Sequence, residues 1–333
     1  MLCPSRVGLA FADQYSIFRT YALGRRDAGK ALITSTSSLI NSFGLRKSCF
    51  PDCGTNAKYL KIKFISPITH HQLPTTMTNI NDLFQSALDD GSISNESLQA
   101  LTVYDLGAQI QAGLGIHVDD VMSSEVVLVT IMPDDSGSIQ YAGNAQAVRG
   151  GHNSVIDALI SSQQQDNILI HNRYLNGTIL YPYCPIAQAI RMDTKNYHPN
   201  QGTPLYDQTV ILLGTVLAKA QEFSDNGVPV RTVTLIITDG DDCHSTRHSA
   251  KDVAAIAKDM LRMENHIIAA MGIDDGSTNF GQVFKEMGIH DEWILTTANS
   301  DGEIRKAFQV FSQSAMRASQ STTNFNSLGG FGG

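Results

Sequence analysis

Residues 126–138 have the sequence VVLVTIMPDDSGS, in which seven apolar or β-branched residues end abruptly in two carboxylates and two hydroxyls. The continuous apolar run over residues 126–132 is typical of a strand covered on both faces, as in a parallel sheet. Asp134, Ser136 and Ser138 then follow at a spacing of two, and the glycine between the serines lets the backbone wrap around a small group. Hard oxygen ligands held this close together suit Mg²⁺, Mn²⁺ or Ca²⁺.

Strands and helices alternate regularly around this stretch. The patterns predict strands at residues 126–132, 167–174, 178–181, 233–238, 266–272 and 293–296, and helices at 144–162, 205–223, 250–263, 281–287 and 301–317. Asn176-Gly177 predicts a tight hairpin between the second and third strands. We therefore expect an α/β fold of the Rossmann-like, doubly wound type, with a mostly parallel sheet, helices on both faces and one antiparallel edge strand.

Composition limits the classes of protein that need consideration. The chain has 333 residues, 42% hydrophobic and 17% charged, which is enough for a full core. No apolar run approaches the roughly 20 residues that cross a bilayer, so we expect no membrane partner. The five cysteines are scattered and odd in number, which favours reduced thiols and a cytoplasmic location.

Charge divides the chain. Residues 1–76 hold ten basic and three acidic residues. The remainder holds 14 of the chain's 24 basic residues and 29 of its 32 acidic residues. We expect a basic, poorly ordered or non-native extension over 1–76, a helical segment over 77–123, the α/β domain over 124–318 and a disordered tail over 319–333. The tail is assigned on its content of Ser, Thr, Asn and Gly.

The basic segment allows three interpretations: a targeting presequence, a poorly ordered arm, or an upstream extension outside the working protein. Met77 begins MTNINDLF, which resembles a natural chain start and favours the third. Residues 58–65 alternate like one strand. Four residues resemble zinc ligands only loosely, and their spacing favours ordinary thiols and surface histidines: Cys49, Cys53, His70 and His71.

A helical hairpin precedes the α/β pattern. Apolar residues recur at helical spacing from Ile80 to Leu88, and Asp90-Gly91 is a stop signal. Ser94 can cap a second helical run that extends to Leu114. We expect this hairpin to pack against the later domain.

Two strands are predicted to deliver acid to the same edge of the sheet. Asp134 follows the first strand, and Asp239 follows the strand at 233–238. Thr203 lies between them in sequence, on a Gly-Thr-Pro loop that leads into a helix. Because ligands of open α/β sheets bind at the carboxyl ends of the strands, a single cation site forms if these strands are neighbours.

These residues resemble a known family. The stretches DDSGS (134–138), GTPL (202–205) and TDG (238–240) are similar to the metal-ion-dependent adhesion site, or MIDAS, of von Willebrand factor A (VWA) domains. The resemblance covers about residues 124–319. It implies that five residues surround a divalent cation, Mg²⁺ or else Mn²⁺ or Ca²⁺: Asp134, Ser136, Ser138, Thr203 and Asp239. The hydroxyls would bind the ion directly, and the carboxylates partly through water. It also implies a protein partner that supplies Asp or Glu, with an AAA+ ATPase or chelatase-like complex as one candidate.

Each motif also has an ordinary explanation. Asp-x-Ser-x-Ser alone is more often a turn or helix cap, Thr203 alone could cap a helix, and Asp239-Gly240 alone could be a turn. The coincidence of all three favours the metal site. Several other residues are assigned to solvated loops or packing rather than to ligation: Asp241, Asp242, Asp274, Asp275, His152, His244 and Cys243.

Three function classes follow. The first is a non-catalytic module that binds a protein partner through the metal. The second is a metal-dependent phosphohydrolase that uses the same Asp/Mg²⁺ site. Against it, the chain has no Walker-type phosphate loop and only Arg247 as a basic residue close in sequence to the motifs. The third, nucleic-acid binding through residues 1–76, is disfavoured because the acidic body would repel phosphate.

Overall fold

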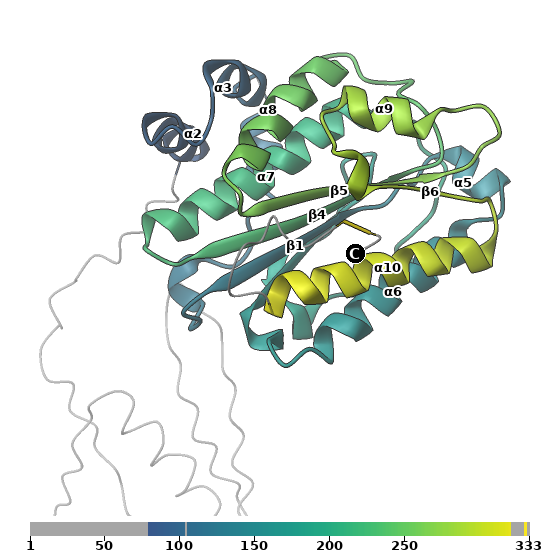
Figure 1. Ribbon diagram of the computed structural model, residues 1–333, viewed down its shortest axis with the longest axis horizontal. Helices are drawn as coiled ribbons and strands as arrows, with labels where there is room; N and C mark the ends of the chain where they lie inside the picture. The colour runs from purple at the N-terminus through teal and green to yellow at the C-terminus, as the bar shows by residue number, and fades with distance from the viewer. Residues whose placement is uncertain (1–78, 104, 321–329, 332–333) are drawn as a thin grey trace, which may run out of the picture. The chain divides into compact units, whose positions relative to one another are not determined.

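A computed structural model describes residues 79–103, 105–320 and 330–331, and a six-stranded sheet forms its centre (Figure 1). The strand order is β3-β2-β1-β4-β5-β6, and every neighbouring pair is parallel except β2 with β3. This confirms the predicted fold class. The strands are Val126–Met132 (β1), Ile168–Arg173 (β2), Ile179–Pro185 (β3), Val230–Thr238 (β4), His266–Ile273 (β5) and Ile294–Thr297 (β6).

Helices cover both faces of the sheet (Figure 1). Helices α6 (Ala145–Ile160) and α10 (Asp301–Gln320) pack against each other on one face. Helix α7 (Leu205–Asp225) lies on the other, beside α8 (Ala250–Arg262). The shorter helical elements are α2 (Ile80–Asp89), α3 (Asn95–Leu101), α4 (Leu106–Gln111), α5 (Gly137–Tyr141), α9 (Phe280–Glu286), and the 3₁₀ turns η1 (Val118–Asp120), η2 (Gln165–Asn167), η3 (Ile186–Gln188) and η4 (Asp291–Trp293).

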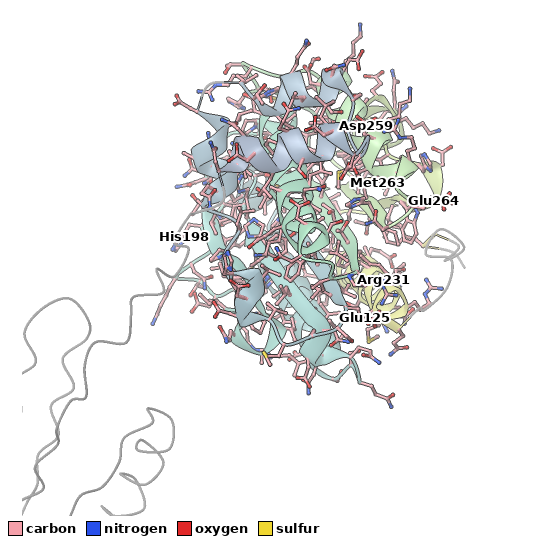
Figure 2. The ribbon with its side chains drawn as sticks, turned by 90° about the vertical axis from the view of Figure 1, so that its left-hand side faces the viewer. Glu125, His198, Arg231, Asp259, Met263 and Glu264 are labelled. Carbon is pink, nitrogen blue, oxygen red and sulfur yellow. The ribbon has the colours of Figure 1, made fainter. Side chains whose placement is uncertain are left out.

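The helices that precede the sheet pack on α7 and α8, as expected for the hairpin. In α2 the buried face is Ile80, Leu83, Phe84 and Ala87, which is the predicted apolar stripe. Asp259 of α8, labelled in Figure 2, accepts hydrogen bonds of 2.6 Å from the backbone N–H of Ser94 and from the Ser97 hydroxyl. This buried carboxylate therefore ties α3 to the α/β domain.

Two of the differences from the predicted boundaries have a clear local cause. The second helical run is split into α3 and α4, because Asp105 has a left-handed backbone (φ 72°) that interrupts helical geometry. Strand β3 continues through Pro182 to Pro185, although proline usually ends a strand. It can do so because β3 lies at the edge of the sheet, where a missing N–H breaks no ladder bond with a further strand.

Some sequence predictions fall on residues that the structure does not describe. The strand at 58–65, the zinc-like residues Cys49, Cys53, His70 and His71, and the whole basic segment lie outside the described residues. Of the predicted tail, Ser319 and Gln320 complete α10, and Gly330 and Phe331 are described separately. None of the described helices is long and apolar enough to cross a membrane.

Candidate metal centre

Strand β1 lies between β2 and β4, and its last residue leads into the loop 133–138, which we name the oxygen loop. Asp134 in this loop is fully buried. Its Oδ1 accepts the backbone N–H of Ser136 at 2.7 Å, and its Oδ2 accepts the Thr238 hydroxyl at 2.8 Å and the Asp239 N–H at 3.3 Å. Asp134 thus joins the end of β1 to the end of β4.

Four of the five predicted ligands converge at this point. The hydroxyls of Ser136 and Ser138 lie 2.8 Å apart, and both donate to Asp239 Oδ1, at 3.3 Å and 2.6 Å. Asp239 belongs to the loop after β4, more than 100 residues from the serines. The parallel register of β1 and β4 places the ends of the two strands side by side, so the distant motifs meet.

The segment that leads to Thr203, the fifth predicted ligand, contacts the oxygen loop. Gln201 O accepts the N–H of Gly137 at 3.0 Å, which holds Gln201, two residues before Thr203, against the oxygen loop. Thr203 N–H donates to His244 Nδ1 at 2.9 Å, and Thr203 O accepts the N–H of His244 at 3.3 Å. In the described part of the chain, no hydrogen bond joins the Thr203 hydroxyl to the other four side chains.

Asp135, which we did not predict as a functional residue, anchors the oxygen loop on its other side. This side chain is 3% exposed, and its Oδ1 accepts the N–H of Asn176 in the β2–β3 hairpin at 3.0 Å. Its backbone O accepts the N–H groups of Asn200 and Gln201 at 2.9 and 3.1 Å. The doubled acid in DDSGS was a visible signal for this residue, but its hairpin partner was not.

Tyr197 is a second anchor that the sequence did not reveal. Its ring is buried and its hydroxyl donates to the backbone O of Asp134. It lies in the long connection between β3 and α7, whose pattern contains no periodicity that would place it. Two separate segments therefore fix the oxygen loop from the β2–β3 side.

Burial disfavours ionisation of the carboxyl groups in this cluster. Burial raises the pKa of Asp134, and burial together with the neighbouring charge of Asp134 raises the pKa of Asp239 to about 6. Burial, with a smaller contribution from Asp134, raises the pKa of Asp135 to about 7. The hydrogen bonds to Asp134 and Asp239 come from hydroxyls and backbone N–H groups, which compensate only part of this penalty.

The donor set fits a hard divalent cation. Two carboxylates and two hydroxyls are all oxygen donors, which is the chemistry of Mg²⁺, Mn²⁺ and Ca²⁺ sites. Among the described residues, no group of three or more His, Cys, Asp or Glu side chains could hold a metal ion. At the oxygen loop the oxygen donors beside Asp134 and Asp239 are the hydroxyls of Ser136 and Ser138.

The structure shows the surroundings of several residues that were assigned to packing or loops. His152 is buried, its Nε2 lies 3.1 Å from the Tyr181 hydroxyl, and burial lowers its pKa to about 4. Asp274 and Asp275 are exposed and accept backbone N–H groups of their own loop. His244 Nδ1 accepts the backbone N–H of Thr203 at 2.9 Å.

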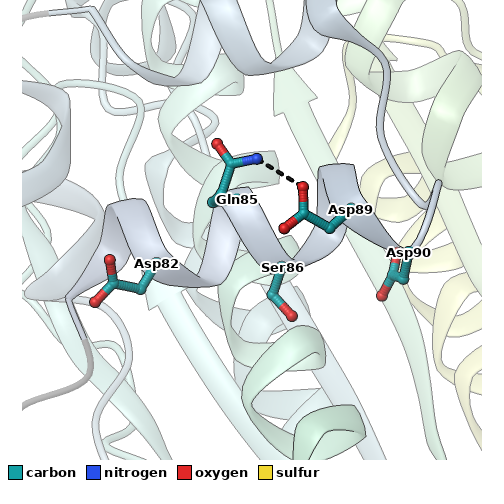
Figure 3. A pocket seen from close by; sticks show the side chains of 5 residues that line it. All are labelled: Asp82, Gln85, Ser86, Asp89 and Asp90. Atoms are coloured by element: carbon teal, nitrogen blue, oxygen red, sulfur yellow. Dashed lines mark hydrogen bonds between the residues drawn. The ribbon is translucent and has the colours of Figure 1, made fainter.

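A separate hollow of about 520 Å³ lies on α2 (Figure 3). It is lined by Asp82, Gln85, Ser86, Asp89 and Asp90, and Gln85 Nε2 donates to Asp89 Oδ1 at 2.8 Å. These are polar side chains of one helix and its C-terminal cap, without the convergence of distant segments seen at the oxygen loop. The oxygen loop is the stronger candidate site.

Comparisons with known proteins give structural neighbours only. No family model and no curated protein matches the chain. A solved structure of proximal thread matrix protein 1 from the mussel byssus, with a zinc-occupied MIDAS motif, has 17% identity over 58% of this chain and 46% of that one, with a TM-score of 0.39. The chain thus spans about half the length of this neighbour.

Two further neighbours have similar scores. A von Willebrand factor type A structure from Catenulispora acidiphila has 18% identity over 58% of this chain and 43% of that one, with a TM-score of 0.37. The manganese-loaded TRAP protein of Plasmodium vivax has 18% identity over 56% of this chain and 74% of that one, with a TM-score of 0.35. The structural neighbours of this chain therefore include von Willebrand factor A domains, the family that its three motifs resemble.

Proposed function

We propose that residues 124–318 form a metal-dependent protein-binding module of the VWA type. Asp134, Ser136, Ser138, Thr203 and Asp239 hold a divalent cation, and an Asp or Glu of a partner protein completes its coordination. The observation that supports this most directly is the meeting of Ser136 and Ser138 with Asp239, at 3.3 and 2.6 Å, at the carboxyl ends of β1 and β4.

The charges of the cluster support a cation. Asp134 and Asp239 are both buried, and the charge of Asp134 disfavours ionisation of Asp239. A divalent cation offsets both charges and supplies Lewis acidity toward an incoming carboxylate. Because the remaining donors are neutral hydroxyls, no further negative charge of the protein surrounds the cation, so it can still accept an anionic ligand from outside.

The surrounding residues hold these donors in place. Thr238 and the N–H groups of Ser136 and Asp239 fix both oxygens of Asp134, so that this side chain cannot turn away. Asp135 and Tyr197 fix the backbone of the same loop from the opposite side. The domain thus binds the cation and orients the carboxylate of the partner, and we assign it no reaction.

The partner and the cellular setting are proposed on weaker grounds. The resemblance of the three motifs to VWA domains supports an adaptor role for an intracellular AAA+ ATPase or chelatase-like complex. Cys184 and Cys243 are free thiols, which fits a reducing compartment such as the cytoplasm. Magnesium is the proposed resident ion, because it is the abundant hard cation of that compartment.

Metal binding can be tested before the partner is known. Mn²⁺ is titrated into the full chain and free Mn²⁺ is followed by electron paramagnetic resonance, in the wild type, Asp134→Ala and Ser138→Ala. We expect both variants to lose most of the binding, and Ser277→Ala, which alters an exposed loop serine, to retain it. Equal binding in all four proteins would refute the site.

The partner hypothesis needs a second measurement. Proteins from the native source are captured on the full chain with Mg²⁺ or with EDTA, and the captured acidic segment is then compared with its Glu→Gln form. We expect capture only with Mg²⁺, and only with the carboxylate. Turnover of an aryl phosphate that is lost in Asp134→Ala would instead favour the phosphohydrolase.

A further inference from the structure

Residues Gly330 and Phe331 make specific contacts with the turn η4, which immediately precedes β6. Phe331 N–H donates to the backbone O of Glu292 at 2.9 Å. The Phe331 ring meets the Trp293 ring edge to face, with centroids 5.5 Å apart and an interplanar angle of 73°. Phe331 also packs against the main hydrophobic core of the domain. A backbone bond and an aromatic contact thus act on the same residue.

The neighbouring position accepts only glycine in this arrangement. A Cβ built on Gly330 would lie 2.1 Å from the backbone O of Glu292 and 2.6 Å from its carbonyl carbon. These are backbone atoms, so no side-chain movement relieves the overlap. The surface on η4 therefore selects for a glycine followed by an aromatic residue.

The receiving surface is built by the folded domain itself. The backbone N–H of Trp293 donates to the backbone O of His290 at 2.9 Å. Lys285 of α9 forms an ion pair of 3.0 Å with Asp291 at the start of η4. The following residue, Ile294, pairs with Ala270 of β5. The turn is held by these contacts independently of residues 330–331.

We propose that the surface around Glu292 and Trp293 is a recognition site for a Gly-Phe segment, and that Gly330–Phe331 of this chain is its resident ligand. The same segment binds there when it is supplied as a separate peptide. A partner protein that uses this surface must present a glycine followed by an aromatic residue and must displace Gly330–Phe331. This site is distinct from the oxygen loop, which follows β1 and β4 and involves none of these residues.

The test uses Trp293, the single tryptophan of the chain, as its reporter. Phe331→Ala in the full chain removes the ring that covers the indole. We expect a red shift of the tryptophan emission and faster quenching by acrylamide than in the wild type. Met122→Ala, which truncates a side chain that is 97% exposed, is the matched control and leaves the emission unchanged.

A synthetic peptide of residues 326–333 is then added to the Phe331→Ala protein. We expect it to restore the wild-type emission in a saturable titration. The peptide that carries Gly330→Ala, and the one that carries Phe331→Ala, should each bind at least about tenfold more weakly, which corresponds to about 1.4 kcal/mol.

Two results would overturn the proposal. One is an emission spectrum that does not change in the Phe331→Ala chain, which would show that Trp293 is not covered by Phe331. The other is equal binding of the wild-type and Gly330→Ala peptides, which would show that the surface does not select glycine.

Discussion

Protons and the metal ion should compete for Asp239, and this competition predicts how metal affinity depends on pH. The pKa of this carboxyl is raised to about 6, first by burial and then by the charge of Asp134. A group with a raised pKa is ionised above that value and protonated below it, while the cation binds only the ionised form. Metal affinity is therefore retained above pH 6 and lost as the pH falls through 6. With one competing proton, affinity falls about tenfold from pH 7 to pH 5.

Isothermal titration calorimetry with Mg²⁺ at pH 7, 6 and 5 measures this dependence. Repeating the pH 6 titration in buffers of different ionisation enthalpy counts the protons released, and we expect Asp239 to release about half a proton at its pKa. The raised pKa of Asp134 acts in the same direction and can only steepen the loss. Asp275→Asn is the matched control, because its hydrogen bonds lower the pKa of that exposed carboxyl to about 2, outside the range. An Mg²⁺ affinity that is constant from pH 7 to pH 5 would refute the reasoning.

Three further predictions concern the scaffold. Burial lowers the pKa of His266 to about 3 in the folded chain. Below pH 6.5 the unfolded chain therefore binds a proton that the folded chain does not, and the folded state loses stability. The unfolding free energy of the wild type minus that of His266→Gln, measured in urea, should be about 2 kcal/mol lower at pH 5 than at pH 8. A difference that does not change with pH would argue against burial of a neutral histidine. Tyr197→Phe removes the hydroxyl that holds the oxygen loop, and should cost about 1 kcal/mol and weaken Mg²⁺ binding; unchanged binding would show that the loop does not need this anchor. Gly115→Ala should destabilise by more than about 2 kcal/mol, because φ is +60° and the new Cβ would lie 2.0 Å from a backbone O of β3. Gly150→Ala, in open space within α6, should instead stabilise by up to about 1 kcal/mol, and equal thermal shifts for the two would contradict this steric argument.

The parts of the fold that were predictable are those whose pattern is purely apolar. Strand β1 has the bounds 126–132 that its continuous apolar run predicts, because a strand covered on both faces needs no polar positions. Strand β4 begins at Val230 and not at 233, since Arg231 interrupts the pattern. In the structure Arg231 bonds with Glu125 at 3.1 Å, so the charge is accommodated within the strand (Figure 2). A partner that is distant in sequence cannot be deduced from the pattern alone.

The same limit applies to the candidate site. Asp134 and Asp239 could be placed together because both follow apolar strands, and parallel strands end at one edge of the sheet. The bond from Asn176 to Asp135 was not predictable, because it depends on how far the hairpin reaches over the neighbouring strand end. Tyr197 lies in a connection without regular structure, where no periodicity constrains a side chain. Sequence patterns thus predicted that these two carboxylates lie together, whereas the residues that hold them follow from tertiary packing.

The topology explains why the oxygen loop follows β1 and no other strand. From β1 the chain passes through α6 on one face to β2, whereas it reaches β4 through α7 on the opposite face. The connections diverge between β1 and β4, and ligands of open α/β sheets bind at such a point. The loop after β1 alone can bond with Asp239 on one side and, through Pro133 and Asp135, with the β2–β3 hairpin on the other. A ligand that binds Asp239 therefore acts on the same six-residue loop that holds the hairpin, so Asp239 and the hairpin are mechanically linked through this loop.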